Sequence, residues 1–201
     1  MKKSYLFFKS FADRIFALFL LLTLFPLFIL IIILLLINHG FPIFFVQKRP
    51  GLFGKPFKLY KFRTMNNKKG FKGDLLPDNK RILKFGAFLR STSLDELPEL
   101  INIIKGEMSF IGPRPLLMEY LKLYTDYQSK RHNMKPGITG LAQVNGRNLL
   151  SWEEKFYFDI HYIENVNFFL DLKIFCKTFW KIYKKEGINS KTNESVIKFK
   201  G

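Results

Sequence analysis

The chain has one cysteine and three histidines, and this scarcity excludes several kinds of site. A single cysteine cannot form an internal disulfide, so the sequence carries no sign of an oxidising compartment. Cys176 lies in an apolar run, which predicts a place in the core. The histidines are not spaced as zinc ligands, and neither a Walker motif nor a Ser–His–Asp signature occurs. The sequence therefore does not indicate a zinc enzyme, a P-loop nucleotidase or a serine hydrolase.

Acidic residues are also scarce, since 16 of them face 33 basic residues and leave a net charge of +17. A basic chain with few aromatic residues would indicate a nucleic-acid partner. This chain instead has 24 phenylalanines and a hydrophobic content of 48%. That composition favours the anionic surface of a phospholipid membrane, and no nucleic-acid partner is expected. The length of 201 residues predicts one domain with an appendage.

Charge is absent altogether from residues 15–37. An apolar run of this length is enough to cross a bilayer as a helix, and it is too long for a signal-peptide core. Pro26 lies in its middle and predicts a break in the helix. Basic residues flank the run on both sides, and positively charged flanks stay in the cytoplasm. From these residues alone, a spanning helix and a re-entrant segment within residues 1–40 are both open interpretations.

Asp95 and Glu96 are adjacent carboxylates that follow Arg90 and three hydroxyl residues. Apolar residues after them recur with helical spacing, and Ser93 and Glu96 are spaced as a capping box. Pro98 moves the expected start of the helix by a residue or two. The pattern places Asp95 in a first helical turn, where free N–H groups and the helix dipole favour anions. One short segment can thus hold a carboxylate nucleophile and the phosphate it attacks; the alternative is an ordinary helix cap.

The remaining residues predict a small soluble domain over residues 41–187, mainly α with short β segments, in the α+β class. A β-like run is expected at 43–47, and period-two alternation predicts an extended segment at 56–65 with its lysines and arginine on an accessible side. A capping box is expected at 151–154 and a flexible tail at 188–201. The expected helices are at 81–89, 97–104, 115–134, 151–163 and 168–185.

Two arginines lie in segments rich in glycine or proline. Arg114 is held between two prolines in a rigid turn, which suits bidentate recognition of phosphate, although a plain surface arginine explains the string as well. Arg147 ends a glycine-containing segment that is able to approach a nucleotide closely. The helix expected at 168–185 combines aromatic residues with lysines, as an amphipathic helix at a membrane surface does. An ordinary core-facing helix is the other interpretation of that segment.

Six short strings occur in order after the apolar run. They are RPGL at 49–52, FKLYKFRTM at 57–65, LRSTSLDELP at 89–98, MSFIGPRP at 108–115, KPGITG at 135–140 and QVNGR at 143–147. Together they resemble the bacterial sugar transferases, the monotopic phosphoglycosyl transferases. In length and C-terminal helices the chain is most similar to the type that transfers diacetylbacillosamine 1-phosphate to undecaprenyl phosphate.

The resemblance implies a reaction. Such enzymes move a sugar 1-phosphate from a UDP-sugar to undecaprenyl phosphate and release UMP, in a ping-pong sequence that begins a glycoconjugate. By matching position, Asp95 would attack the sugar-linked phosphate and form an aspartyl-phosphosugar. Glu96 would assist proton removal from the lipid phosphate or help to place Mg²⁺, so Asp95 and Glu96 are the expected metal ligands. Mg²⁺ binds one or two carboxylates together with substrate phosphates, which fits this pair.

The resemblance also implies the other site residues and the location. Lys61, Arg90 and Arg114 match basic residues that would hold phosphates, and Arg147 would meet the nucleotide. The first helix of the family is re-entrant and broken at a Ser-Pro pair; here the pair is Phe25-Pro26. A re-entrant anchor implies an active site on the cytoplasmic face of the bacterial inner membrane. The competing hypothesis is a membrane-anchored basic binding protein without catalytic activity, and the sequence identifies neither the UDP-sugar nor the oligomeric state.

Overall fold

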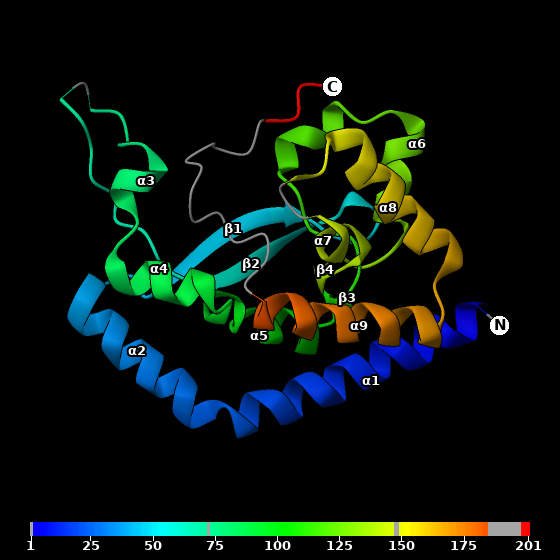
Figure 1. Ribbon diagram of the computed structural model, residues 1–201, viewed down its shortest axis with the longest axis horizontal. Helices are drawn as coiled ribbons and strands as arrows, with labels where there is room; N and C mark the ends of the chain where they lie inside the picture. The colour runs from blue at the N-terminus through cyan, green and yellow to red at the C-terminus, as the bar shows by residue number, and fades with distance from the viewer. Residues whose placement is uncertain (1, 72, 147–148, 185–197) are drawn as a thin grey trace.

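The computed structural model describes residues 2–71, 73–146, 149–184 and 198–201. As predicted, the chain is mainly helical with short strands. Two N-terminal helices, α1 (Lys2–Thr23) and α2 (Phe25–His39), form a V along one side of a body built from the other elements (Figure 1). Arg147 belongs to the residues outside the described ranges, so its predicted role stays a prediction.

The break predicted at Pro26 is confirmed. Pro26 lies in the first turn of α2, where its missing N–H removes no hydrogen bond of that helix, but it cannot extend α1. Among the described residues, no single helix is both long enough and apolar enough to cross a membrane. One bent pair, Lys3–Thr23 with Phe25–His39, meets the test of length and composition when its members are taken together, and the angle between them is 63°.

The V is joined to the body by apolar packing. Ala17 of α1 is fully buried and packs with residues of the body. Phe28, Ile31 and Leu35 of α2 pack against Phe62 and Leu89. Residues 1–40 and the body therefore share a hydrophobic core.

A polar junction fixes the N-terminal half of α1. Lys9 Nζ lies 2.9 Å from Asp171 Oδ2, and the Tyr5 hydroxyl donates to the same oxygen at 2.6 Å. The Ser109 hydroxyl donates to Asp13 Oδ2 at 2.5 Å. The charges that flank the apolar run thus hold α1 against the body, and the Lys9–Asp171 pair is largely shielded from water, since its side chains are 8% and 9% exposed.

The first sheet is an antiparallel hairpin of β1 (Phe44–Pro50) and β2 (Pro56–Phe62), joined by the 3₁₀ turn η1 (Leu52–Gly54). Its register pairs Phe44 with Phe62 and Pro50 with Pro56. The β-like run expected at 43–47 is therefore a full strand, and the segment expected to extend to 65 ends at Phe62.

The second sheet was not predicted. It is a parallel pair of β3 (Ser109–Ile111) and β4 (Gly137–Thr139), which the sequence presents as two turn-like segments. Glycine permits the pairing, because a Cβ at Gly137 would lie 2.1 Å from the Gly112 nitrogen. The pair fixes the start of the Pro113–Pro115 turn.

The helices of the body are short. They are α3 (Asp78–Arg81), α4 (Lys84–Ser91), α5 (Glu99–Ile104), α6 (Asp126–Ser129), α7 (Leu141–Asn145), α8 (Trp152–Asn165) and α9 (Phe168–Tyr183), with 3₁₀ turns η2 (Leu94–Glu96), η3 (Met118–Lys122) and η4 (Lys130–Asn133). The single helix predicted over 115–134 is wrong. Leu117 and Thr125 have extended backbones, and Thr125 opens α6 with its own capping box to Gln128, so the segment divides into η3, α6 and η4.

The capping box predicted at 151–154 is confirmed: the Glu154 N–H donates to the Ser151 hydroxyl, and the Ser151 N–H donates to the Glu154 carboxylate. Ile174 of α9 is fully buried, whereas Phe169 is 79% exposed, so α9 has one core face and one exposed aromatic face. The prediction that Cys176 is buried is wrong, because it lies on the exposed part of α9.

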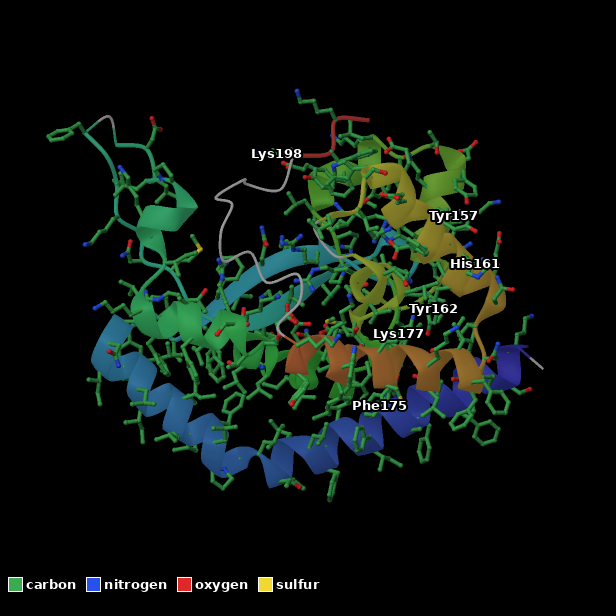
Figure 2. All side chains as sticks on the ribbon, viewed as in Figure 1. Tyr157, His161, Tyr162, Phe175, Lys177 and Lys198 are labelled. Carbon is green, nitrogen blue, oxygen red and sulfur yellow. The ribbon has the colours of Figure 1, made fainter. Side chains whose placement is uncertain are left out.

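Figure 2 shows Phe175 on the side of α9 toward α1 and Lys177 on the opposite side. Part of the segment expected as a flexible tail is also ordered by packing, since Phe199 is buried among aromatic rings.

Candidate active site

The two adjacent carboxylates lie in η2, between α4 and α5. The capping box predicted for Ser93 and Glu96 is wrong: the Ser93 side chain makes no capping bond, and its φ of 58° is left-handed. Pro98 then occupies the N-cap of α5, so the helix begins at Glu99. Asp95 consequently lies in a 3₁₀ turn ahead of α5 and not in its first turn.

Two cations hold Glu96. Lys61 Nζ lies 2.5 Å from Glu96 Oε1, and Arg114 contributes a guanidinium nitrogen at 3.0 Å from the same oxygen. Lys61 also lies 3.1 Å from Glu99 Oε1. The structure therefore brings Lys61, Glu96 and Arg114 together, as the predicted site requires, and adds Glu99, which the sequence reasoning missed. Glu99 lies three residues after Glu96 in the same string, and that spacing was the available signal.

Lys61 corrects a prediction about β2. The alternation placed the lysines and arginine of this strand on an accessible side, and Lys58 is indeed exposed. Lys61 instead shares the inward face with Phe57 and Leu59, and its side chain is only 17% exposed. A cation in this position is retained because Glu96 and Glu99 face it from η2 and α5.

The Asp95 carboxylate differs from its neighbour. Within the part of the chain that the structure describes, it makes no hydrogen bond and no ion pair. Burial and, to a smaller extent, the charge of Glu96 raise the pKa of Asp95 to about 6. The nearby charges of Lys61, Arg90 and Arg114 act in the opposite direction. A carboxylate with an elevated pKa and no partner is available to react.

The pKa values of Glu96 and Glu99 are shifted in opposite directions. Burial acts to raise the pKa of Glu96, but Arg114 and Lys61 outweigh it and hold the value at about 2. Burial and the charge of Glu96 raise the pKa of Glu99 to about 7. At neutral pH, Glu96 is therefore ionised, and it is Glu99 that can take up a proton.

Arg114 is fixed through its backbone while its side chain stays half exposed. Arg131 donates to the Arg114 carbonyl at 2.8 Å and forms a buried ion pair with Asp159 at 2.7 Å. Arg49 donates to the carbonyl of Pro115 at 3.4 Å. These supporting residues were not found from the sequence, since an ion pair between distant positions such as 131 and 159 leaves no local pattern.

Arg90 is not part of the ion-pair cluster. It is exposed near the end of α4, and its guanidinium lies 3.5 Å from the sulfur of Met65. Its charge is nevertheless close enough to lower the pKa of Asp95.

The expected Mg²⁺ site consists of two adjacent carboxylates, Asp95 and Glu96. Over the described ranges, no group of three or more histidine, cysteine, aspartate or glutamate residues forms a preformed cage. The unpartnered Asp95 carboxylate next to Glu96 does fit a cation that takes one or two carboxylates and completes its shell with substrate phosphates.

Family membership follows from a profile match. The profile of the bacterial sugar transferases matches residues 4–185 and thus includes nearly all of α1, the whole of α2, the β1–β2 hairpin and all the carboxylates described above. The chain belongs to the bacterial sugar transferase family. Relatives agree: the uncharacterized sugar transferase EpsL of Bacillus subtilis is 56% identical over 162 residues, which are 81% of this chain and 80% of the relative.

Two further relatives of this bacterial sugar transferase carry names that state a role. The exopolysaccharide production protein ExoY of Sinorhizobium fredii is 39% identical over 183 residues, covering 83% of this chain and 81% of the relative. The UDP-glucose:undecaprenyl-phosphate glucose-1-phosphate transferase of Escherichia coli is 41% identical over 151 residues, covering 70% of this chain but only 32% of that longer protein. The resemblance to the diacetylbacillosamine type is not tested by these matches and stays a prediction.

Proposed function

We propose that this transferase moves a sugar 1-phosphate from a UDP-sugar to undecaprenyl phosphate, with release of UMP, in an early step of glycoconjugate synthesis. The single observation that supports the chemistry best is the unpartnered Asp95 carboxylate beside a Glu96 held by Lys61 and Arg114. The substrates are taken from relatives named for undecaprenyl-phosphate galactose and glucose phosphotransfer. The alternative of a binding protein without catalysis is not favoured, because the chain belongs to an enzyme family.

In the first step, an Asp95 oxygen attacks the phosphorus that carries the sugar. A phosphorus–oxygen bond to Asp95 forms, the bond to the bridging oxygen breaks, and UMP leaves with that oxygen. Lys61 and Arg114 lie close enough to Glu96 to place positive charge next to the transferred group. Phosphoryl transfer depends mainly on such positioning and charge neutralisation.

In the second step, an oxygen of the lipid phosphate attacks the same phosphorus and Asp95 is released as a carboxylate. One site then serves a soluble donor and a lipid acceptor in turn, as covalent catalysis permits. A group with a pKa of about 2 is a weak base, so the low pKa supports a role for Glu96 in holding cations. A phosphate monoester is already largely ionised at neutral pH and needs little help with its proton.

Mg²⁺ would be held by Asp95 and Glu96 together with the donor phosphates, and when bound it supplies further charge neutralisation. The unpartnered oxygens of Asp95 support this assignment, since they are free to accept a cation. Removal of divalent cations by a chelator is expected to stop UMP release, and addition of Mg²⁺ is expected to restore it.

The V of α1 and α2 is proposed to be a re-entrant anchor in an anionic phospholipid membrane, with the active site on the cytoplasmic face. Its support is the 63° bend and the many exposed apolar side chains on both arms. The exposed aromatic face of α9 would lie in the headgroup region. Cysteines placed at residues 3 and 55 should both be labelled from the cytoplasmic side; labelling of residue 3 only from outside would show a spanning helix instead.

The direct assay measures UMP from UDP-sugar with and without undecaprenyl phosphate, across a panel of donors. Multiple turnover is expected only when both substrates and Mg²⁺ are present, and stoichiometric UMP is expected with donor alone. Failure of every donor to yield UMP would favour the binding-protein alternative.

The rate of UMP release with donor alone is expected to depend on the ionisation of Asp95. Because its pKa is about 6, the reactive carboxylate falls about fivefold between pH 6 and pH 5. Glu96→Gln removes a negative neighbour, so the pKa of Asp95 should fall and the acid limb should move to lower pH. Rapid-quench rates from pH 4.5 to 8 measure both profiles, and a limb that does not move in the Glu96→Gln variant argues against this assignment.

Arg114→Ala should lower kcat/KM for the donor by an amount worth about 1–3 kcal/mol, since a charge-assisted contact to phosphate is lost. Lys84→Ala, which removes an exposed cation of α4, is the matched control and should leave kcat/KM unchanged. Equal behaviour of the two variants would place Arg114 outside the donor site.

A further inference from the structure

Phe199 lies in an aromatic cage at the end of the body opposite the V, where Figure 1 shows the C-terminal residues. Its side chain is 7% exposed. The cage consists of Tyr120, Tyr124, Trp152 and Phe156, whose ring centroids lie between 5.2 and 5.8 Å from that of Phe199. The Tyr120 hydroxyl also accepts a hydrogen bond from the Phe199 N–H at 3.4 Å. Since Phe199 lies beyond the matched residues 4–185, this contact is not part of the family profile.

Two rings of the same cage also contact Arg131, the residue that fixes Arg114. The Arg131 guanidinium lies 5.8 Å from the ring centroid of Phe156 and 6.0 Å from that of Tyr124. Its side chain is 2% exposed, and it forms the ion pair with Asp159, one helical turn after Phe156 on α8. Phe199 and Arg131 therefore contact the same two rings.

Arg131 connects this ion pair to the site, because it also donates a 2.8 Å hydrogen bond to the Arg114 carbonyl. The geometry of this pair depends on exclusion of water, because a buried ion pair and a cation over aromatic rings both weaken when water reaches them. Phe199 packs against both rings, with centroid distances of 5.2 Å to Phe156, which is 1% exposed, and 5.8 Å to Tyr124, so it helps to keep water away from them.

We propose that Phe199 is a positioning residue for donor binding: by closing the aromatic cage, it keeps Arg131 in place and thereby holds the Arg114 turn at Glu96. Phe199 touches no reacting group itself. The proposal rests on the proposed function, because its consequence is a change in the use of the UDP-sugar.

The test compares KM for the UDP-sugar in UMP-release assays of the full chain. Phe199→Ala should raise this KM at least about fivefold with little change in kcat at saturating donor. Phe199→Leu, which keeps an apolar side chain in the cage, should restore most of the wild-type KM. Lys198→Ala, at the exposed neighbouring position labelled in Figure 2, is the matched control and should behave as wild type.

A second comparison separates positioning from general stability. In the Arg114→Ala background, Phe199→Ala should raise the KM no further, because both changes act through the same side chain. An equal rise in both backgrounds, or an unchanged KM with a lowered melting temperature, overturns the proposal while leaving the transferase function intact. A wild-type chain that releases no UMP refutes the proposed function and this role with it.

Discussion

Asp95→Asn is expected to lower turnover by about 10⁴-fold or more, because an amide cannot form the covalent bond to phosphorus. The fold should survive, since among the described residues the Asp95 carboxylate has no hydrogen-bond or ion-pair partner to lose. UMP release and lipid-linked product are measured with the same donor and acceptor for both proteins. Asp74→Asn, in the exposed loop before α3, is the matched control and should retain full turnover.

The same variant should be more stable than the wild type above pH 6. Burial and the Glu96 charge raise the pKa of Asp95 in the folded state to about 6, so the ionised form opposes folding at higher pH. Asparagine removes this penalty, and the free energy of unfolding should rise by on the order of 2 kcal/mol at pH 8, with no gain near pH 4. Near-normal turnover, or a loss of stability at pH 8, would contradict the description of Asp95 as an unpartnered nucleophile with a raised pKa.

Lys61→Met should give the second largest effect, and it should affect both activity and stability. Glu96 and Glu99 would be left close together without the cation that bridges them, so turnover should fall by on the order of 10³-fold. The free energy of unfolding should fall by about 3 kcal/mol at pH 8, as is typical when one partner of a buried ion pair is removed.

The stability loss in this variant should depend on pH in a defined direction. The pKa of Glu99 is already raised to about 7, so Glu99 becomes protonated as the pH falls and no longer needs Lys61. The difference between Lys61→Met and wild type should therefore be smaller at pH 5 than at pH 8. Lys58→Met, at an exposed position of the same strand, should change neither quantity; a similar loss in both variants would mean that Lys61 acts only through strand propensity.

Features set by local chemistry could be predicted from the sequence. Pro26 lacks an N–H group whatever surrounds it, so the break between α1 and α2 followed from one residue. The capping box of Ser151 and Glu154 needs only residues within one turn. The candidate site could be found in outline, because adjacent carboxylates flanked by hydroxyls and arginines are informative within a single string.

Features that depend on distant contacts could not be predicted. The left-handed conformation at residue 93 is not marked by glycine or asparagine, so the sequence predicts a helix cap where the structure has the η2 turn. Lys61 is nearly buried only because η2 and α5 supply two carboxylates to it, which strand alternation cannot show. The three-residue strands β3 and β4 are too short for a periodic pattern, and their pairing joins segments far apart in the chain.

The covalent intermediate is tested most directly by mass spectrometry of the acid-quenched enzyme after incubation with UDP-sugar and Mg²⁺ but no lipid acceptor. We predict an added sugar phosphate on the peptide that contains Asp95, released when undecaprenyl phosphate is supplied and missing from the Asp95→Asn variant. An adduct on another residue, or lipid-linked product formed with no adduct at any time, would contradict the account.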